Sequence, residues 1–554
     1  MKKGTRATAK ASWSAAALVV VVAVLAAVLA LAGCQKKTTD GDSDQTKAVN
    51  TTLTLGLESE AFSMDPIYSY DYGTTAVVQV TESLLYYDNQ DQLQPGLVES
   101  WQQVDDTTYT YQVRQNVTFS DGSAMTMEDV LYSLERYRDP DLASDLSWMY
   151  DSVDTITQTG DWEFTVKLKA PDATWKHVFA TTGGHVQKKS FVEAAGDANG
   201  TPAGGILGTG PYKVTDWDST SQMVMEYNPN YWNAATDGEP DVKKIVIQFI
   251  TEDATRVLAS TSGQIDLNLG TPVEMVEDVR KSDQVNLIEK PSMGLYFLAF
   301  NCQKPPFDDV NVRRAISSAF DAQVIQDSIV KDCGTLTNYL PIPATLYSFE
   351  KDSWTEYEKT ANKYPYDLDK AKEYLSKSAY PDGFDCEIVV DERGVFNSVT
   401  LYMQQQLKKI GINVKINKLS NDEVVTWQLG GGIKDGVRPY DMLQAEWGAD
   451  YPDPSGDLTP LFDSSGIGDG GSNTSAYSNK EVDRLLDEQA ASSDDAERTR
   501  LMQEALDIIV DEAPAYVWTH QNYLWTVNKR VSGLEDLSGN WFWSIYFKNL
   551  KLSE

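Results

Sequence analysis

Apolar and polar residues alternate with a period of two in several short segments of the first third of the chain. Thr52–Leu57, residues 109–114 and residues 162–168 place apolar side chains at every second position. This spacing is typical of half-buried β-strands. Residues 126–129 (TMED) have the sequence of a capping box and predict a helix that continues through Leu134. The first third is therefore expected to mix α and β structure.

Residues 245–250 (IVIQFI) form a nearly continuous apolar run, as in a strand buried on both faces. A helix is predicted from Asp253 to Gly263. Residues 385–390, 398–410 and 412–419 then predict a strand, a helix and a strand. Such a βαβ unit implies parallel strands joined by a right-handed crossover.

The last part of the chain predicts two further helices, one after the capping sequence at 478–481 and one over 498–510, before Pro514. No internal repeat of solenoid period is visible. Two α/β lobes are the simplest architecture that accommodates these elements.

The N-terminal segment combines four basic residues before position 11 with an apolar run over residues 15–32. Its length would also suit an uncleaved transmembrane anchor, since about 20 apolar residues can span a bilayer. The small residues before Cys34 and the polar residues after it favour processing instead. Residues 31–34 (LAGC) resemble the lipobox of bacterial lipoproteins. This resemblance implies a signal peptide over 1–33, acylation of Cys34, and a lipid anchor on the extracellular face of the bacterial cytoplasmic membrane.

Residues 34–50 lack apolar periodicity after the cysteine and are expected to form a flexible tether. The remaining chain is too long for one hydrophobic core, so two or three folded units are expected. The formal net charge of −35 argues against a nucleic-acid partner, because phosphate binding needs clustered Lys and Arg. No second apolar run approaches spanning length, which excludes a channel or a permease.

Cysteine and histidine are scarce, with Cys34, Cys302, Cys333 and Cys386 and three histidines. Without a CxxC motif, a Cys/His metal site is not expected. Acylation of Cys34 would leave three cysteines, which allow either one disulfide with one thiol or three thiols. Residues 466–471 satisfy GxGxxG, but polar residues surround them, so a loop is predicted rather than a dinucleotide site. Neither an enzyme nor a cofactor is expected.

Residues 446–454 (EWGADYPDP) place Trp447 and Asp450 on a proline-bounded loop after an apolar strand-like segment. An indole ring offers a large apolar face to a ligand, and a carboxylate can pair with a buried ammonium. Alternatively, the Trp packs in the core and the Asp caps a turn. These residues alone favour neither interpretation.

Eight short motifs follow one another in order along the chain. They are residues 64–66 (MDP), 82–85 (ESLL), 95–101 (PGLVESW), 117–122 (VTFSDG), 208–212 (GTGPY), 228–232 (NPNYW), 304–310 (KPPFDDV) and 313–315 (RRA). Together they resemble the solute-binding proteins of peptide and nickel ABC importers, the extracellular family 5 type. The resemblance extends from about residue 52 to the C-terminus.

The resemblance implies an α/β fold of two lobes, like the class II periplasmic binding proteins, with an extra subdomain on the first lobe. Lobe 1 is then expected over 51–84, 207–297 and 521–554, the extra subdomain over 85–206, and lobe 2 over 298–520. The chain should cross between lobes near residues 297–301 and 518–523. Closure of the hinge would enclose the ligand in a monomer.

The resemblance also implies capture of peptides, with oligopeptides as the expected class, and their delivery to ABC permease subunits without catalysis. Asp450 matches the aspartate that pairs with the peptide α-ammonium. The aromatic residues expected to contact ligand are Trp447, Trp427, Tyr296, Trp518, Trp148 and Tyr150. Gln444 occupies a position where oligopeptide receptors carry a basic residue. The preceding loop of those receptors carries a basic cluster, of which this chain has only Lys434 and Arg438. The carboxylate anchor and the peptide length therefore stay open.

Other functions fit the sequence less well. A receptor of the same architecture for oligosaccharide or another small solute would not need a buried carboxylate such as Asp450. A secreted hydrolase should show a nucleophile elbow or a metal triad, and a surface adhesin should show repeats; neither is visible. The scarcity of histidine argues against the nickel branch.

Overall fold

The structure, a computed structural model, describes residues 50–60, 63–69, 73–336, 340–344, 346–361, 364–537 and 545–554. The predicted signal peptide, Cys34 and the predicted tether up to residue 49 lie outside these residues. Among the described residues, no helix combines the length and the apolar character that crossing a membrane would require.

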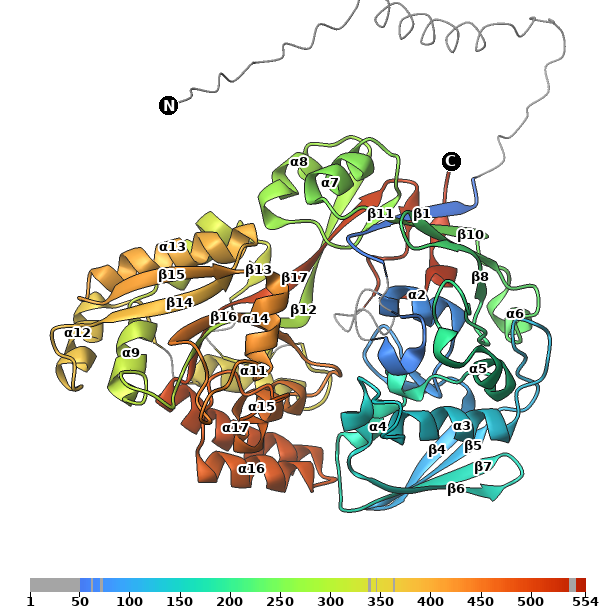
Figure 1. Ribbon diagram of the computed structural model, residues 1–554, viewed down its shortest axis with the longest axis horizontal. Helices are drawn as coiled ribbons and strands as arrows, with labels where there is room; N and C mark the ends of the chain where they lie inside the picture. Colours follow the sequence, from blue (N-terminus) through green and yellow to red (C-terminus); the bar gives the residue numbers. More distant parts are fainter. Residues whose placement is uncertain are drawn as a thin grey trace, which may run out of the picture. The chain divides into compact units, whose positions relative to one another are not determined.

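Two long strands organise the largest sheet of the described residues, which has eleven strands (Figure 1). β12 (Val285–Phe300) and β17 (Ala515–Asn528) pair antiparallel along most of their length. From Gly294 onward β12 also pairs with β16 (Met442–Gly448), whereas the end of β17 pairs with β11 (Leu267–Asn268). The two strands therefore belong to both lobes. The register between β12 and β17 shifts between Pro291 and Leu295.

Lobe 2 contains the predicted βαβ unit. β14 (Asp385–Asp391) and β15 (Asn413–Leu419) are parallel and are joined by α13 (Gly394–Lys408), as predicted. The helix begins four residues earlier than its apolar spacing suggested, directly after Arg393. β16 also runs parallel to β14. β14 and β16 are largely buried, in keeping with their apolar sequences, whereas β15 (NVKINKL) is only partly buried.

Lobe 1 is built on β1 (Thr52–Leu57), which lies between β10 (Lys244–Phe249) and β11. β9 (Gln222–Tyr227) and β8 (Tyr212–Asp218) extend the sheet antiparallel. The prediction that β10 is buried on both faces was wrong. Ile245 and Ile247 are buried, while Val246 and Gln248 on the other face are only half-buried. The predicted helix after β10 is confirmed as α7 (Asp253–Thr261).

The extra subdomain carries a separate four-stranded antiparallel sheet in the order β4-β5-β7-β6. Its strands are β4 (Val98–Asp105), β5 (Thr108–Val113), β6 (Val153–Gly160) and β7 (Glu163–Leu168). α3 (Met127–Arg138) packs with it and begins at the predicted capping box. There the Thr126 hydroxyl accepts from the backbone N–H of Asp129, and the Asp129 carboxylate accepts from the backbone N–H of Thr126 at 2.9 Å.

The other helices and strands complete the two lobes and the extra subdomain. They are α2 (Gly73–Val80), β2 (Leu85–Tyr87), β3 (Leu93–Pro95), α4 (Trp175–Val178), α5 (Lys189–Ala195), α6 (Ala234–Asp237), α8 (Val276–Arg280), α9 (Val310–Ser318), α10 (Ala322–Ile325), β13 (Gly334–Thr335), α11 (Lys351–Thr360), α12 (Leu368–Ser376), α14 (Asn421–Gln428), α15 (Ser455–Phe462), α16 (Lys480–Ala490), α17 (Asp495–Glu512), β18 (Val531–Ser532) and β19 (Lys551–Leu552). Cys302, Cys333 and Cys386 are free thiols.

Three of the family motifs meet at one half-buried carboxylate, Glu82. It accepts hydrogen bonds from the Thr209 hydroxyl at 2.8 Å, the Tyr231 hydroxyl at 3.1 Å and the Trp232 indole at 2.7 Å. Burial raises the pKa of Glu82, and these donors and Lys548 oppose that shift. The motifs at 82–85, 208–212 and 228–232 are therefore tied together by packing within lobe 1.

A buried ion pair joins α3 of the extra subdomain to the 64–66 motif. Arg136 binds Asp65 through both terminal nitrogens, at 2.9 and 2.5 Å, and also donates to Gln187 at 2.8 Å. We expect Asp65→Asn to lower the free energy of unfolding by about 3–5 kcal/mol, because the buried Arg136 loses its charged partner. Denaturant unfolding followed by circular dichroism measures this loss.

Glu373→Gln is the matched control, since Glu373 pairs with Lys370 and Lys377 at the exposed surface of α12. Exposed pairs contribute little to stability, so the unfolding midpoint of this variant should match the parent. Equal midpoints for Asp65→Asn and the parent would show that the buried pair does not hold the subdomain in place.

Candidate ligand-binding site

The site is best located from the carboxyl ends of two parallel strands in lobe 2. β14 ends at Asp391 and its neighbour β16 ends at Gly448. Arg393 and Asp450 each follow two residues after one of these ends. Ligands of open α/β sheets bind outside the carboxyl ends of parallel strands. The two strands therefore bring a basic and an acidic residue to the same edge of the sheet.

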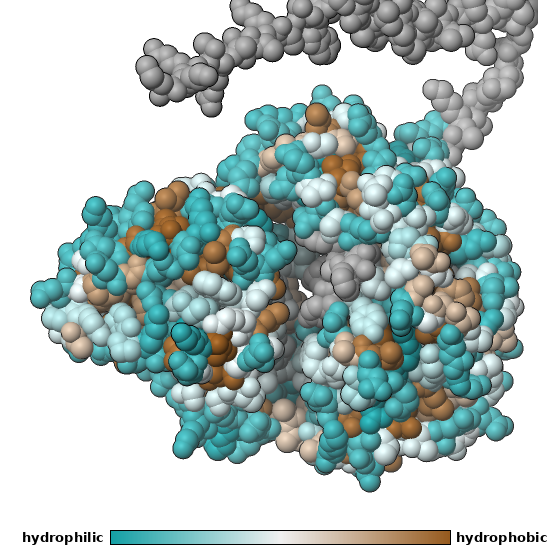
Figure 2. Space-filling view, in the orientation of Figure 1, coloured by the Kyte–Doolittle hydropathy of each residue, from teal (hydrophilic) through white to brown (hydrophobic). Residues whose placement is uncertain are grey.

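The long strands bring predicted aromatic residues to this edge as well. Tyr296 of β12 lies opposite Glu446 of β16 and opposite Thr519 of β17. Leu295 lies opposite Trp447. A register irregularity in the β12–β17 pairing falls directly after Tyr296. The edge thus coincides with the region where the chain passes between the lobes, and Figure 2 shows a groove there among mainly hydrophilic surfaces.

Strand alternation divides the predicted aromatic residues between the two faces of the sheet. The Tyr296 ring lies 4.8 Å from Phe396 and 5.1 Å from Trp518, measured between ring centroids. Trp447 packs against the hydrophobic cluster on the opposite face, and its indole donates to the Gly456 carbonyl at 3.0 Å. Tyr296 and Trp447 therefore belong to two groups of side chains that share the end of the sheet.

Asp450 lies in a strongly acidic environment and is 6% exposed. Asp453 is fully buried and bound by Arg498 at 2.8 and 3.0 Å. Burial opposes its ionisation, but Arg498 and His177 hold the pKa of Asp453 well below its usual range. Burial, followed by the charges of Asp450 and Asp453, raises the pKa of Asp457 well above its usual range. The surroundings of Asp450 therefore favour a cationic group.

Arg393 was missed by the sequence analysis. Its guanidinium binds Asp391 at 2.5 Å and Glu446 at 3.1 Å and lies 4.9 Å from the ring centroid of Phe396. The side chain is still 45% exposed, so it can reach a ligand. The available signal was a basic residue two positions after the end of a buried parallel strand.

The basic residues predicted from the family cluster take other positions. Arg438 is 1% exposed and donates to the carbonyls of Gln428 at 3.1 Å and Asn473 at 2.7 Å, among others, so it ties two loops together. Lys434 is exposed in a tight turn with Val437. Gln444 is buried and accepts from the Trp518 indole at 3.0 Å, which explains why this position is uncharged.

The remaining predicted site residues differ in their access to solvent. Trp518 is fully buried but borders a cavity of about 250 Å³ that Tyr366 and His520 also line. Trp427 is half-buried in α14, with its ring 6.4 Å from that of Tyr440. Trp148 is 43% exposed.

Tyr150 belongs to the core of the extra subdomain. It is 3% exposed, its hydroxyl donates to the Gly183 carbonyl at 2.5 Å, and its ring stacks on Tyr137. This placement favours a packing role for Tyr150.

Comparison with known proteins identifies the family. Residues 92–469 match the model of the bacterial extracellular solute-binding proteins, family 5 Middle. The probable D,D-dipeptide-binding periplasmic protein DdpA of Escherichia coli (strain K12) is 30% identical over 497 residues, which cover 87% of this chain and 90% of that protein. The glutathione-binding protein GsiB of Salmonella typhi is 27% identical over 466 residues, covering 83% and 87%.

Two solved structures share the two-lobe fold. DppA from Helicobacter pylori in complex with peptide STSA has a TM-score of 0.76 at 24% identity, covering 91% of this chain and 98% of that chain. The oligopeptide-binding protein AppA from Bacillus subtilis in complex with a nonapeptide has a TM-score of 0.74 at 20% identity, covering 91% and 99%. The chain belongs to the bacterial extracellular solute-binding proteins of family 5.

Proposed function

We propose that this protein captures peptides between its two lobes and delivers them to an ABC permease, without catalysis and without a cofactor. The observation that carries the proposal is the pair Arg393 and Asp450, which follow adjacent parallel strands at the edge where the lobes meet. Opposite charges at one edge suit a ligand with an ammonium and a carboxylate. The peptide, dipeptide and glutathione ligands in the names of its relatives support this class of ligand.

In this proposal Asp450 binds the α-ammonium, and Arg393 binds a ligand carboxylate through its exposed side. The aromatic rings of Tyr296 and Trp447 offer apolar faces on either side of the sheet edge to varied side chains. Backbone groups at a strand edge can bind the peptide main chain. A neutral oligosaccharide, the alternative solute, needs neither of the two charges.

We further propose that the protein acts as a monomer anchored through acylated Cys34 at the extracellular face of the cytoplasmic membrane. The apolar run and the LAGC sequence support the anchor. A tethered receptor stays near its permease, which raises its effective concentration there.

Asp450→Asn should weaken binding of a peptide with a free N-terminus by about 100- to 5,000-fold. The variant keeps the shape of the side chain but strands the ligand ammonium, which costs about 3–5 kcal/mol for a buried pair. Calorimetric titration of di- to tetrapeptides with the parent and the variant measures the change.

N-acetylated peptides complete this test. Acetylation removes the same charge from the other partner, so acetylation and Asp450→Asn together should cost much less than the sum of their separate effects. If N-acetylated and free peptides bind the parent equally well, Asp450 does not bind an ammonium, and the small-solute alternative gains support.

Arg393→Gln should weaken binding of peptides with a free carboxylate by about 10-fold and leave C-terminally amidated peptides unaffected, since hydrogen bonds to charged groups contribute about 1.5–3 kcal/mol and Arg393 is half exposed. Arg393→Lys should lie between, because lysine keeps the charge but not the planar fork. Lys434→Ala is the comparison variant. If Lys434→Ala, and not Arg393→Gln, changed the preference for a free carboxylate, the carboxylate anchor would be Lys434 and not Arg393.

Cys34→Ser should leave the precursor uncut or release the protein into the medium, because serine lacks the thiol that would be acylated. Metabolic labelling with a fatty acid and fractionation of cells from medium measure both effects. Normal processing and membrane retention of the Cys34→Ser protein would contradict a lipid anchor.

A further inference from the structure

The extra subdomain contacts lobe 2 at a defined place next to the Asp450 loop. The imidazole of His177 in α4 stacks on the ring of Tyr451, with centroids 5.0 Å apart and planes inclined by 4°. Tyr451 directly follows Asp450 and packs against the hydrophobic core of the subdomain, although it belongs to lobe 2. The loop that carries the proposed ligand anchor is therefore also the loop that touches the other lobe.

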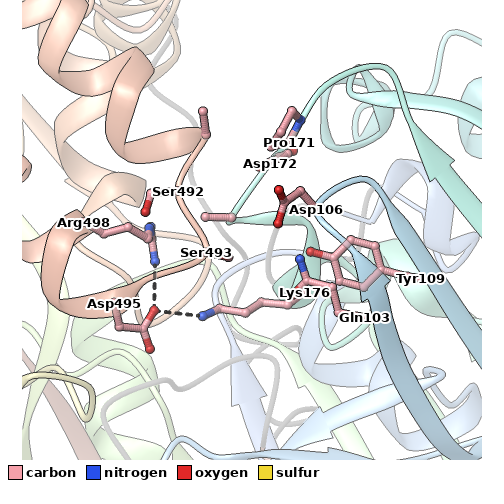
Figure 3. A pocket seen from close by; sticks show the side chains of 12 residues that line it. Gln103, Asp106, Tyr109, Pro171, Asp172, Lys176, Ser492, Ser493, Asp495 and Arg498 are labelled. Atoms are coloured by element: carbon pink, nitrogen blue, oxygen red, sulfur yellow. Dashed lines mark ion pairs between the residues drawn. The ribbon is translucent and has the colours of Figure 1, made fainter.

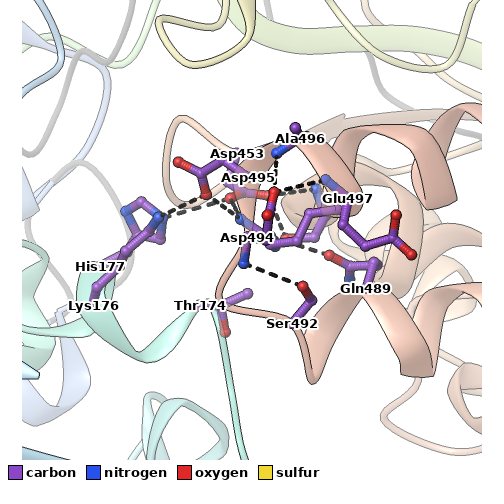
Figure 4. Close-up of polar contacts among 12 residues, drawn as sticks. Thr174, Lys176, His177, Asp453, Gln489, Ser492, Asp494, Asp495, Ala496 and Glu497 are labelled. Carbon is purple, nitrogen blue, oxygen red and sulfur yellow. Dashed lines mark hydrogen bonds and ion pairs between the residues drawn. The ribbon is translucent and has the colours of Figure 1, made fainter. Parts of the chain in front are cut away.

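Polar contacts hold the imidazole of His177. The Tyr87 hydroxyl lies 2.6 Å from its Nδ1. Oδ2 of Asp453 lies 3.7 Å from its Nε2 (Figure 4). Burial lowers the pKa of His177 from its ordinary value, against the opposing effect of Asp453. A neutral imidazole that accepts from Tyr87 at Nδ1 carries its proton on Nε2, facing the Asp453 carboxylate. Asp453 itself is held by Arg498.

A second group of contacts lies beside these rings. The backbone N–H of Ala173 donates to the carbonyl of Ala490 at 2.8 Å, and Lys176 reaches Asp495 at 3.6 Å (Figure 3). Beside these contacts is a crevice of about 40 Å³. Its lining includes Asp172 and Lys176 of the subdomain and Ser492 and Arg498 of lobe 2.

The contacts across this junction are largely polar. They include the His177–Tyr451 ring pair, the Ala173–Ala490 hydrogen bond and the Lys176–Asp495 ion pair. Interfaces between domains that move relative to one another are typically polar, so this junction is suited to opening and closing.

We propose that His177 and Tyr451 form a latch that holds the extra subdomain against lobe 2 and keeps the Asp450 loop in its ligand-binding position. The latch contributes to the closed form for every ligand alike, since it consists of a contact between two side chains of the protein itself. The proposed latch depends on the proposed function only in the experiment that measures ligand binding.

Binding of trialanine measures the latch. His177→Ala and Tyr451→Ala should each weaken binding by roughly 2- to 10-fold, mainly through faster dissociation, as expected for an aromatic pair. The double variant should lose little more than either single variant, because both changes remove one contact. Tyr451→Phe keeps the ring and should bind like the parent, as should Lys176→Ala, whose ion pair is exposed. Unchanged binding by both alanine variants would overturn the proposal.

A ligand-free measurement separates the latch from the proposed function. Ala173→Cys with Ala490→Cys places two thiols across the junction, where mild oxidation should form a disulfide. Adding Tyr451→Ala should slow this cross-link severalfold, while adding Tyr451→Phe should not. A slowed cross-link in a protein that fails to bind trialanine would retain the latch and argue against peptide capture. No cross-link, or a rate insensitive to Tyr451→Ala, would overturn the latch.

Discussion

The pairing of β12 with β17 is the constraint on which the rest of the structure depends. Both strands are long enough to take part in two lobes, so one continuous sheet serves two cores. Where they leave lobe 1, β12 gains β16 as a neighbour, and β16 in turn is parallel to β14. The carboxyl ends of those parallel strands, and with them Arg393 and Asp450, are therefore set beside the crossing. The same two strands that would act as a hinge between the lobes also place the proposed site beside the crossing.

Local sequence signals predicted the elements well, because each depends on a few neighbouring residues. The capping box at Thr126, the βαβ unit and α7 were all predicted from spacing and caps, and the structure confirms them. The family motifs were equally informative, and the structure shows why. Three of them meet at Glu82, and another contributes Asp65 to a buried ion pair, so they record packing within lobe 1 rather than contact with ligand.

The site was less predictable, because it depends on which face of a strand each residue occupies. Tyr296 and Trp447 come from neighbouring strands, yet alternation sends their rings to opposite faces. Arg438 was predicted to contact ligand from the family's basic cluster, but it is buried and donates to backbone carbonyls of two loops. Arg393 carried no motif, and only the parallel pairing of β14 with β16 brings it to the edge where Asp450 lies. These outcomes follow from tertiary pairing, which no local pattern encodes.

The Asp450 loop connects electrostatics to motion. Three neighbouring aspartates, two in this loop and Asp457 in α15, have different surroundings: Arg498 neutralises Asp453, burial favours the protonated form of Asp457, and Asp450 lies beside them at the sheet edge. The ion pair that steadies Asp453 also orients the loop, so that Tyr451 meets His177 across the junction. In the proposed function, a ligand ammonium at Asp450 would bind this same loop beside the point where the lobes touch. Ligand binding and contact between the lobes then favour the same loop position, which gives closure a physical link to binding.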